Sequence, residues 1–134
     1  MISPIQFDAG KTLKLPLATS TTLTKGMAVI WTSGYIALAV NTTEDVYGVA
    51  LQDKVSTSDN PDVLILPVDP SIRFEGDCDG VVSIVDRGTR CDLADNSNFN
   101  PDAVTEKVFL IEEIVGAAEV STKVRGRFCR FTAT

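Results

Sequence analysis

Residues 27–40 read MAVIWTSGYIALAV, and this stretch decides the fold. Two runs of β-branched, aromatic and aliphatic residues flank Ser33-Gly34, a dipeptide typical of a two-residue hairpin turn. After a polar turn at residues 41–45 (NTTED), residues 46–51 (VYGVAL) have the composition of a third strand. The stretch therefore predicts three consecutive β-strands.

The segments on either side supply further strands. Residues 13–17 (LKLPL) alternate in the manner of an edge strand, because Pro16 has no amide hydrogen to donate to a neighbour. Residues 63–68 (VLILPV) are apolar throughout and predict a strand that is buried on both faces. Residues 75–80 (EGDCDG) indicate an acidic turn, and residues 81–85 (VVSIV) predict the strand that follows it.

One stretch, from Ala103 to Val115, fits two secondary structures. Its valine and isoleucine residues recur at helical spacing, whereas residues 108–111 are continuously apolar, as in a buried strand. We favour a strand over residues 107–115, because no other segment of the chain indicates a helix. Residues 120–134 carry the last predicted strand.

Together these segments predict an all-β fold of about eight or more short antiparallel strands, arranged as a β-barrel or a β-sandwich. Neither a repeat nor a linker divides the chain, and 134 residues suit one domain. Residues 1–10 (MISPIQFDAG) read as an extended N-terminal arm, with Ile5 and Phe7 on one face. The expected organisation is this arm followed by a single domain over residues 11–134.

The composition argues against several classes of function. A net charge of −6 disfavours direct binding of nucleic acid, and no apolar run reaches the roughly 18 residues of a membrane span. The chain has no histidine, so Ser-His-Asp and Cys-His catalytic arrangements are impossible. Phosphate-binding loops and nucleophile-elbow motifs do not occur. We expect a protein that is not an enzyme and carries no cofactor.

The cysteines suit a reducing compartment. Cys78, Cys91 and Cys129 are widely spaced and odd in number, which fits a disulfide framework poorly. Residues 1–10 lack the pattern of a signal peptide, so we expect free thiols in a cytoplasm. A bridge between Cys78 and Cys91 is the alternative.

Two acidic segments are candidate sites. From Asp92 to Asp102, oxygen-bearing side chains recur as calcium requires, but the glycine and the final glutamate of an EF-hand are missing. We expect an Asx-rich loop that makes its own turns. Glu75, Asp77 and Asp79 would share one face of an extended segment and could shift one another's pKa, as in acid catalysis. Their flanking glycines favour a solvated turn instead.

A basic stripe and an aromatic pair are candidates for partner binding. Alternation in the last strand sends Lys123, Arg125 and Arg127 to one face, opposite Val124 and Phe128. The stripe either balances nearby carboxylates on a solvated face or contacts an acidic partner or a neighbouring subunit.

Trp31 and Tyr35 flank the hairpin turn. They predict either a cross-strand packing pair or an exposed pair that stacks on a sugar or contacts a protein.

Several of these segments resemble a known family. Residues 25–29 (KGMAV), 34–39 (GYIALA) and 46–51 (VYGVAL) are similar to the head decoration (cement) proteins of tailed bacteriophages. Residues 88–93 (GTRCDL) and 124–128 (VRGRF) also look like that pattern, so the similarity extends over most of residues 25–131.

The resemblance implies a β-rich, often trimeric protein that binds the outer surface of an assembled capsid and holds neighbouring capsid subunits together. The expected partner is the major capsid protein and the expected location is the virion, after synthesis in the host cytoplasm. Ile5 and Phe7 could then dock the arm on a capsid subunit or a sister protomer. A tail or fibre module that binds sugar through Trp31 and Tyr35 is one alternative, and a carboxylate-based hydrolase is another.

Overall fold

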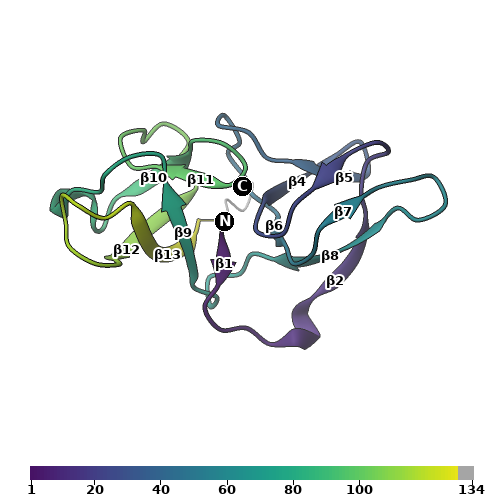
Figure 1. Ribbon diagram of the computed structural model, residues 1–134, viewed down its shortest axis with the longest axis horizontal. Helices are drawn as coiled ribbons and strands as arrows, with labels where there is room; N and C mark the ends of the chain where they lie inside the picture. The colour runs from purple at the N-terminus through teal and green to yellow at the C-terminus, as the bar shows by residue number, and fades with distance from the viewer. Residues whose placement is uncertain (130–134) are drawn as a thin grey trace, which may run out of the picture.

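The computed structural model describes residues 1–129, and its regular structure is almost entirely β-strand (Figure 1). The strands, in chain order, are β1 (Ser3–Pro4), β2 (Leu13–Pro16), β3 (Thr22–Leu23), β4 (Ala28–Thr32), β5 (Tyr35–Leu38), β6 (Gly48–Ala50), β7 (Lys54–Val55), β8 (Asp62–Pro67), β9 (Phe74–Cys78), β10 (Arg90–Leu93), β11 (Asn98–Asn100), β12 (Phe109–Ile114) and β13 (Lys123–Phe128). Two single-turn 3₁₀ helices, η1 (Ala9–Lys11) and η2 (Ile84–Asp86), complete the described elements. The predicted all-β class is confirmed.

The C-terminal half of the chain forms a closed barrel. Its five strands follow the order β9, β11, β10, β12 and β13, and β13 pairs back with β9 to close the ring. Neighbouring strands are antiparallel except for β9 and β11. Strand β1 pairs with β9 on the edge that β11 also uses, so the N-terminus of the chain is part of this sheet.

Four phenylalanines fill the barrel. Phe99 and Phe109 stack with ring centroids 3.9 Å apart, and Phe128 lies edge-on to Phe74 and Phe109 at 5.1 and 5.2 Å. All four are buried, because alternation along each strand directs them inward. Aromatic pairs in these geometries stabilise a core beyond the area that they bury, by about 1 kcal/mol each.

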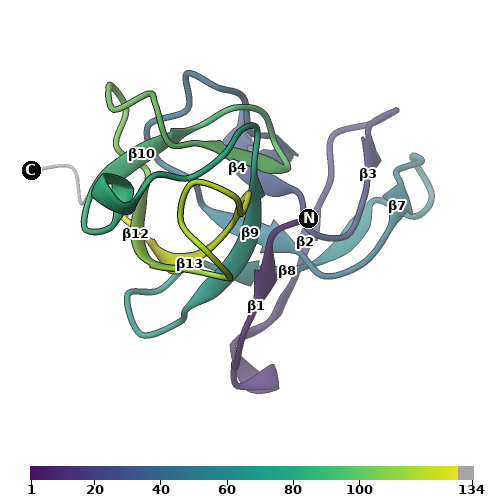
Figure 2. The same ribbon diagram turned by 60° about the vertical axis from the view of Figure 1, so that its left-hand side comes forward.

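The N-terminal half forms a second, curled sheet in the order β2, β8, β6, β4 and β5. Thr32 and Tyr35 pair across Ser33-Gly34, which confirms the predicted hairpin, and β6 pairs with β4 as the third strand. A parallel bridge between Leu17 and Ile36 brings the end of β2 to β5. Strands β3 and β7 form a small separate ladder beside this sheet (Figure 2).

The two sheets share one apolar core. Along β8 and β6, side chains alternate between the large cluster that contains the barrel phenylalanines and a smaller cluster inside the curled sheet. Leu66 and Val49 belong to the large cluster, whereas Val63 and Ile65 belong to the small one. Strand β8 is therefore buried on both faces, as its apolar sequence predicts.

Two predictions around residue 80 are wrong. Residues 75–80 are not a turn but mostly lie in β9, where Gly76 makes room for a neighbour: a Cβ there would be 2.5 Å from Cε2 of Phe99. Residues 81–85 are not a strand, because hydrogen bonds hold residues 81–83 as a loop and residues 84–85 in η2. The carboxylates of Asp86 and Glu119 accept the amides of Ser83 and Ile84 at 2.8 and 3.1 Å.

The last two predicted strands are confirmed with shorter bounds, as β12 and β13, so the helical alternative for residues 103–115 is wrong. The end of the last predicted strand, residues 130–134, lies outside the described residues. The division into an arm at 1–10 and a domain at 11–134 stays a prediction. No helix among residues 1–129 has the length and apolarity that crossing a membrane requires.

The cysteines are free thiols in the described part of the chain, so the alternative of a Cys78–Cys91 bridge is wrong. Cys78 and Cys91 are buried in the large cluster, whereas Cys129 is partly exposed. Burial raises the pKa of Cys78 to about 12 and also raises the pKa of Cys91. Both thiols are therefore neutral near pH 7 and behave as apolar core groups.

Candidate interaction surface

The first residues of the chain are docked on the body rather than free. Ile2 is buried in the large cluster, and its amide donates to the carbonyl of Gly26 at 3.0 Å. After β1, the amide of Ile5 donates to the carbonyl of Arg73 at 2.9 Å. These contacts hold β1 between the edge of β9 and the turn that precedes β4.

A projecting loop follows this docked strand. We call residues 5–12, between β1 and β2, the N-terminal loop; residues 5–11 are all exposed. The loop leaves the body, turns through η1 and returns into β2 in both views (Figures 1 and 2). Asp8 fixes the turn, because its carboxylate accepts the amide of Gly10 at 2.9 Å. The exposed fractions of Ile5 and Phe7 are 44% and 39%.

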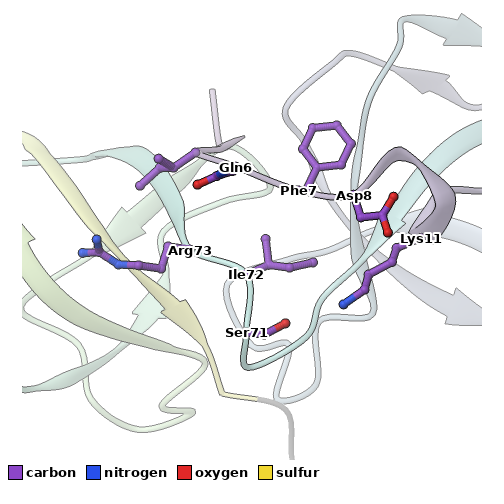
Figure 3. A pocket seen from close by; sticks show the side chains of 8 residues that line it. Gln6, Phe7, Asp8, Lys11, Ser71, Ile72 and Arg73 are labelled. Carbon is purple, nitrogen blue, oxygen red and sulfur yellow. The ribbon is translucent and has the colours of Figure 1, made fainter.

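A hollow of about 530 Å³ lies between the N-terminal loop and the segment that leads into β9. Its apolar lining comes from Ile5, Phe7 and Ile72, and charged groups of Lys11 and Arg73 border it (Figure 3). In this view Ile72 points into the hollow while the ring of Phe7 points away from Ile72. Phe7 also lines a second hollow, of about 410 Å³, on the side of Ile2 and Leu64. The loop thus presents apolar side chains beside two hollows.

The predicted basic stripe lies on one outer face of the barrel, but each of its cations has a carboxylate partner. Arg125 binds Glu75 at 2.9 Å, and Lys123 lies 3.9 Å from Asp77. Both carboxylates come from β9, although the local sequence of this segment predicts a turn.

Arg127 completes the stripe through Glu112, which lies 3.1 Å away and also binds Arg73 at 3.2 Å. Arg73 reaches Glu113 at 2.7 Å as well, and this bond lowers the pKa of the Glu113 carboxyl.

We call these eight residues the charged face. Four cationic side chains meet four carboxylates on this face, so its side-chain charges balance, and the N-terminal ammonium of Met1 also lies 3.4 Å from Asp77. Of the two interpretations of the stripe, the geometry agrees with a solvated face that balances nearby carboxylates.

Trp31 and Tyr35 do not form a cross-strand pair. The partners across the hairpin are Thr32 with Tyr35 and Trp31 with Ile36, so the two aromatic side chains point to opposite faces of the sheet. The ring of Trp31 instead lies edge-on to Tyr47, with centroids 5.3 Å apart. Sequence reasoning missed Tyr47, because only the register of β4 against residues 47–49 brings it to Trp31.

The predicted Asx-rich loop is confirmed. Asp95 accepts the amides of Ser97 and Asn98 at 2.8 and 2.9 Å, and the side chain of Asn100 accepts the amide of Asp102 at 3.1 Å. Strand β11 lies within this loop. Within residues 1–129, the structure brings together no group of three or more cysteine or acidic side chains that could hold a metal ion.

The sequence predictions for partner binding therefore separate in space. Ile5 and Phe7 lie together on the N-terminal loop, the three cations lie on the charged face, and Trp31 and Tyr35 lie apart on the second sheet. No protein-family model matches the sequence, and no curated protein is significantly similar to it.

Proposed function

We propose that the protein is a non-enzymatic structural protein of a tailed phage that binds the outer surface of the assembled capsid and stabilises it. The major capsid protein is the proposed partner, and the virion is the proposed location. The observation that carries the proposal is the exposure of Ile5 and Phe7 on a loop that is fixed at both ends to a rigid β body. The resemblance of residues 25–29, 34–39 and 46–51 to segments of decoration proteins suggests the same function.

The way the loop is held suits a contact between proteins. Strand β1 holds its start on β9, and β2 holds its end on β8, so little chain entropy is lost when the loop binds. Ile5 and Phe7 would bury their exposed area in a partner, worth about 1 kcal/mol for each side chain. A single loop of this size gives a weak contact.

We propose that a homotrimer supplies the remaining affinity. Three linked copies that engage three capsid subunits would raise the apparent affinity by roughly 10²- to 10⁴-fold without a new contact. Sedimentation velocity of the purified protein tests this part directly, because a monomer at all concentrations would contradict it.

The test of the main proposal uses expanded, undecorated capsids of the cognate phage. A double variant, Ile5→Ser with Phe7→Ser, should lose co-sedimentation with the capsids while keeping its own unfolding temperature within a few degrees. Val55→Ser is the matched control, since Val55 has an exposed fraction of 61% and lies on β7, outside the N-terminal loop.

Binding of the unchanged protein should also raise the temperature at which the capsids burst. If the unchanged protein does not bind, capsid decoration is wrong. If it binds and the double variant binds equally well, the loop is not the contact.

A further inference from the structure

A third hollow lies on the second sheet, away from the N-terminal loop. Its volume is about 360 Å³, and it shares no lining residue with the two hollows beside that loop. Its lining residues are Ile30, Trp31, Thr43, Glu44, Asp45 and Tyr47. We call it the Trp31 hollow.

The Trp31 hollow lies beside an open strand edge. Strand β6 pairs with β4 only at Ala28 and Val29, and the amide of Tyr47 donates to Val29 at 3.0 Å. Beyond Val29, the only strand paired with β4 in the described residues is β5, on its other edge. Backbone groups alternate between the two edges of a strand, and the carbonyls of Met27 and Val29 face β6, so beyond Val29 the amide and carbonyl of Trp31 face this edge. These two groups can hydrogen-bond to an extended segment.

The walls of the hollow are fixed before any ligand arrives. Trp31 keeps an exposed fraction of 43% although its ring is held edge-on to Tyr47. On the opposite wall, the hydroxyl of Thr43 accepts the amide of Val40 at 2.9 Å and holds the turn that carries Glu44 and Asp45. Ligand binding would cost little reorganisation of these groups.

The charge of the hollow identifies the kind of ligand. None of the ion pairs among residues 1–129 includes Glu44, Asp45 or the nearby Glu106. Desolvation and the neighbouring charge of Glu44 raise the pKa of Glu106, so like charges lie together beside the hollow. A cationic ligand would relieve this repulsion, whereas a neutral sugar would not.

We propose that the Trp31 hollow binds an arginine or lysine side chain on an extended segment of a partner protein. The cation lies against the ring of Trp31, the best aromatic residue for such a contact, and faces the carboxylates of Glu44 and Asp45. The backbone of the segment adds to the open edge of β4. This binding site does not depend on the capsid proposal, because it uses none of the residues of the N-terminal loop.

The chain offers a built-in reporter. Trp31 is its single tryptophan, so the tryptophan fluorescence of the protein reports on the hollow alone. The probe is a capped five-residue peptide of threonine and valine with a central arginine. The matched probe carries citrulline instead, which has nearly the same shape without the charge.

We expect the arginine peptide to change Trp31 fluorescence in a saturable way and to shift the amide NMR signals of residues 30–32 and 43–47. The citrulline peptide should bind at least tenfold more weakly. A Glu44→Gln, Asp45→Asn variant should bind the arginine peptide at least tenfold more weakly than the unchanged protein does.

The control variant Asp59→Asn, Asp62→Asn removes the same net charge from exposed positions outside the hollow, and it should bind like the unchanged protein. The proposal is wrong if the two peptides bind equally well, or if the two variants lose equal affinity for the arginine peptide. It is also wrong if millimolar arginine peptide does not change the fluorescence of Trp31. A response of Trp31 to neutral oligosaccharides but not to the arginine peptide would also overturn it and would indicate a sugar site.

Discussion

Individual residues stabilise the barrel in two ways. Some have no side chain and let two strands approach closely, and others accept hydrogen bonds from a neighbouring loop. Gly126 and Asp92 show the two cases. At Gly126 the backbones of β13 and β12 approach so closely that no side chain fits, and Asp92 is a buried carboxylate that holds a loop by its amides. Each makes a separate prediction about stability.

Replacing Gly126 with alanine should severely destabilise the protein. The added Cβ would lie 1.8 Å from the carbonyl oxygen of Leu110, a backbone atom that cannot move without opening the barrel. We expect the free energy of unfolding to fall by about 3 kcal/mol or more in urea denaturation. Gly80→Ala is the control, since no atom lies within 4 Å of a Cβ at that position, and its effect should stay below about 0.5 kcal/mol. Similar losses in both variants would contradict the argument.

Replacing Asp92 with alanine should release the loop before β12. Its carboxylate accepts the amides of Thr105, Glu106 and Lys107 at 3.3, 2.7 and 2.9 Å, and the side chain has an exposed fraction of only 5%. We expect a loss of about 3 kcal/mol in the free energy of unfolding, together with faster hydrogen exchange of those three amides. Asp59→Ala, at an exposed position, should leave both measurements unchanged.

At the scale of elements, β1 couples the N-terminus to the barrel. Ile2 and Ile5 flank this strand but differ in environment, with exposed fractions of 1% and 44%. Ile2→Ala should therefore lower the free energy of unfolding by about 2 to 4 kcal/mol, because it leaves a cavity in the shared core. Ile5→Ala should cost less than about 1 kcal/mol. Equal effects of the two substitutions would show that β1 is not docked as described.

The sequence predicts those elements whose pattern is local. The hairpin around Ser33-Gly34 is a two-residue turn between two β-rich runs, so its register follows from neighbouring residues. Strand β9 could not be predicted, because glycine and aspartate at residues 76–79 have the local chemistry of a turn. Its strand conformation depends on Phe99 and Ile2, which pack over Gly76 from distant parts of the chain.

The candidate surfaces could also be predicted only where their pattern is local. The apolar character of Ile5 and Phe7 and the alternation of the basic stripe are readable in the sequence. The sequence predicts that carboxylates could balance the stripe, but it does not show which ones. Strand order determines which residues face one another. The same reason explains why Tyr47, rather than Tyr35, meets Trp31.

At the scale of the whole molecule, the thiols buried in the shared core make the free energy of unfolding fall as the pH becomes alkaline. The raised pKa values of Cys78 and Cys91 mean that the folded state holds both protons more tightly than the unfolded state does. The contribution of these thiols is fully present below the unfolded pKa, about 8.5, and is lost as the pH rises toward 12.

In urea denaturation under reducing conditions, the free energy of unfolding should fall by about 1.5 kcal/mol per buried thiol between pH 8.5 and 10. The double variant Cys78→Ala, Cys91→Ala should have a flatter pH profile. Burial also raises the pKa of Cys129, but this thiol is partly exposed, so Cys129→Ala should flatten the profile less than the double variant does. If the double variant has the same slope as the unchanged protein, the buried thiols are not the cause of the pH dependence.

The pairing of β13 with β9 also has a consequence for synthesis on the ribosome. Lys123 to Gly126 pair with Asp77 to Phe74, so the ring cannot close until residues 123–126 have emerged from the exit tunnel. The curled sheet, which is complete by residue 67, can form earlier and expose the apolar side of β8 and β6 while the rest is translated. Such high contact order slows folding, and nascent chains stalled before residue 123 are the ones that chaperones should retain.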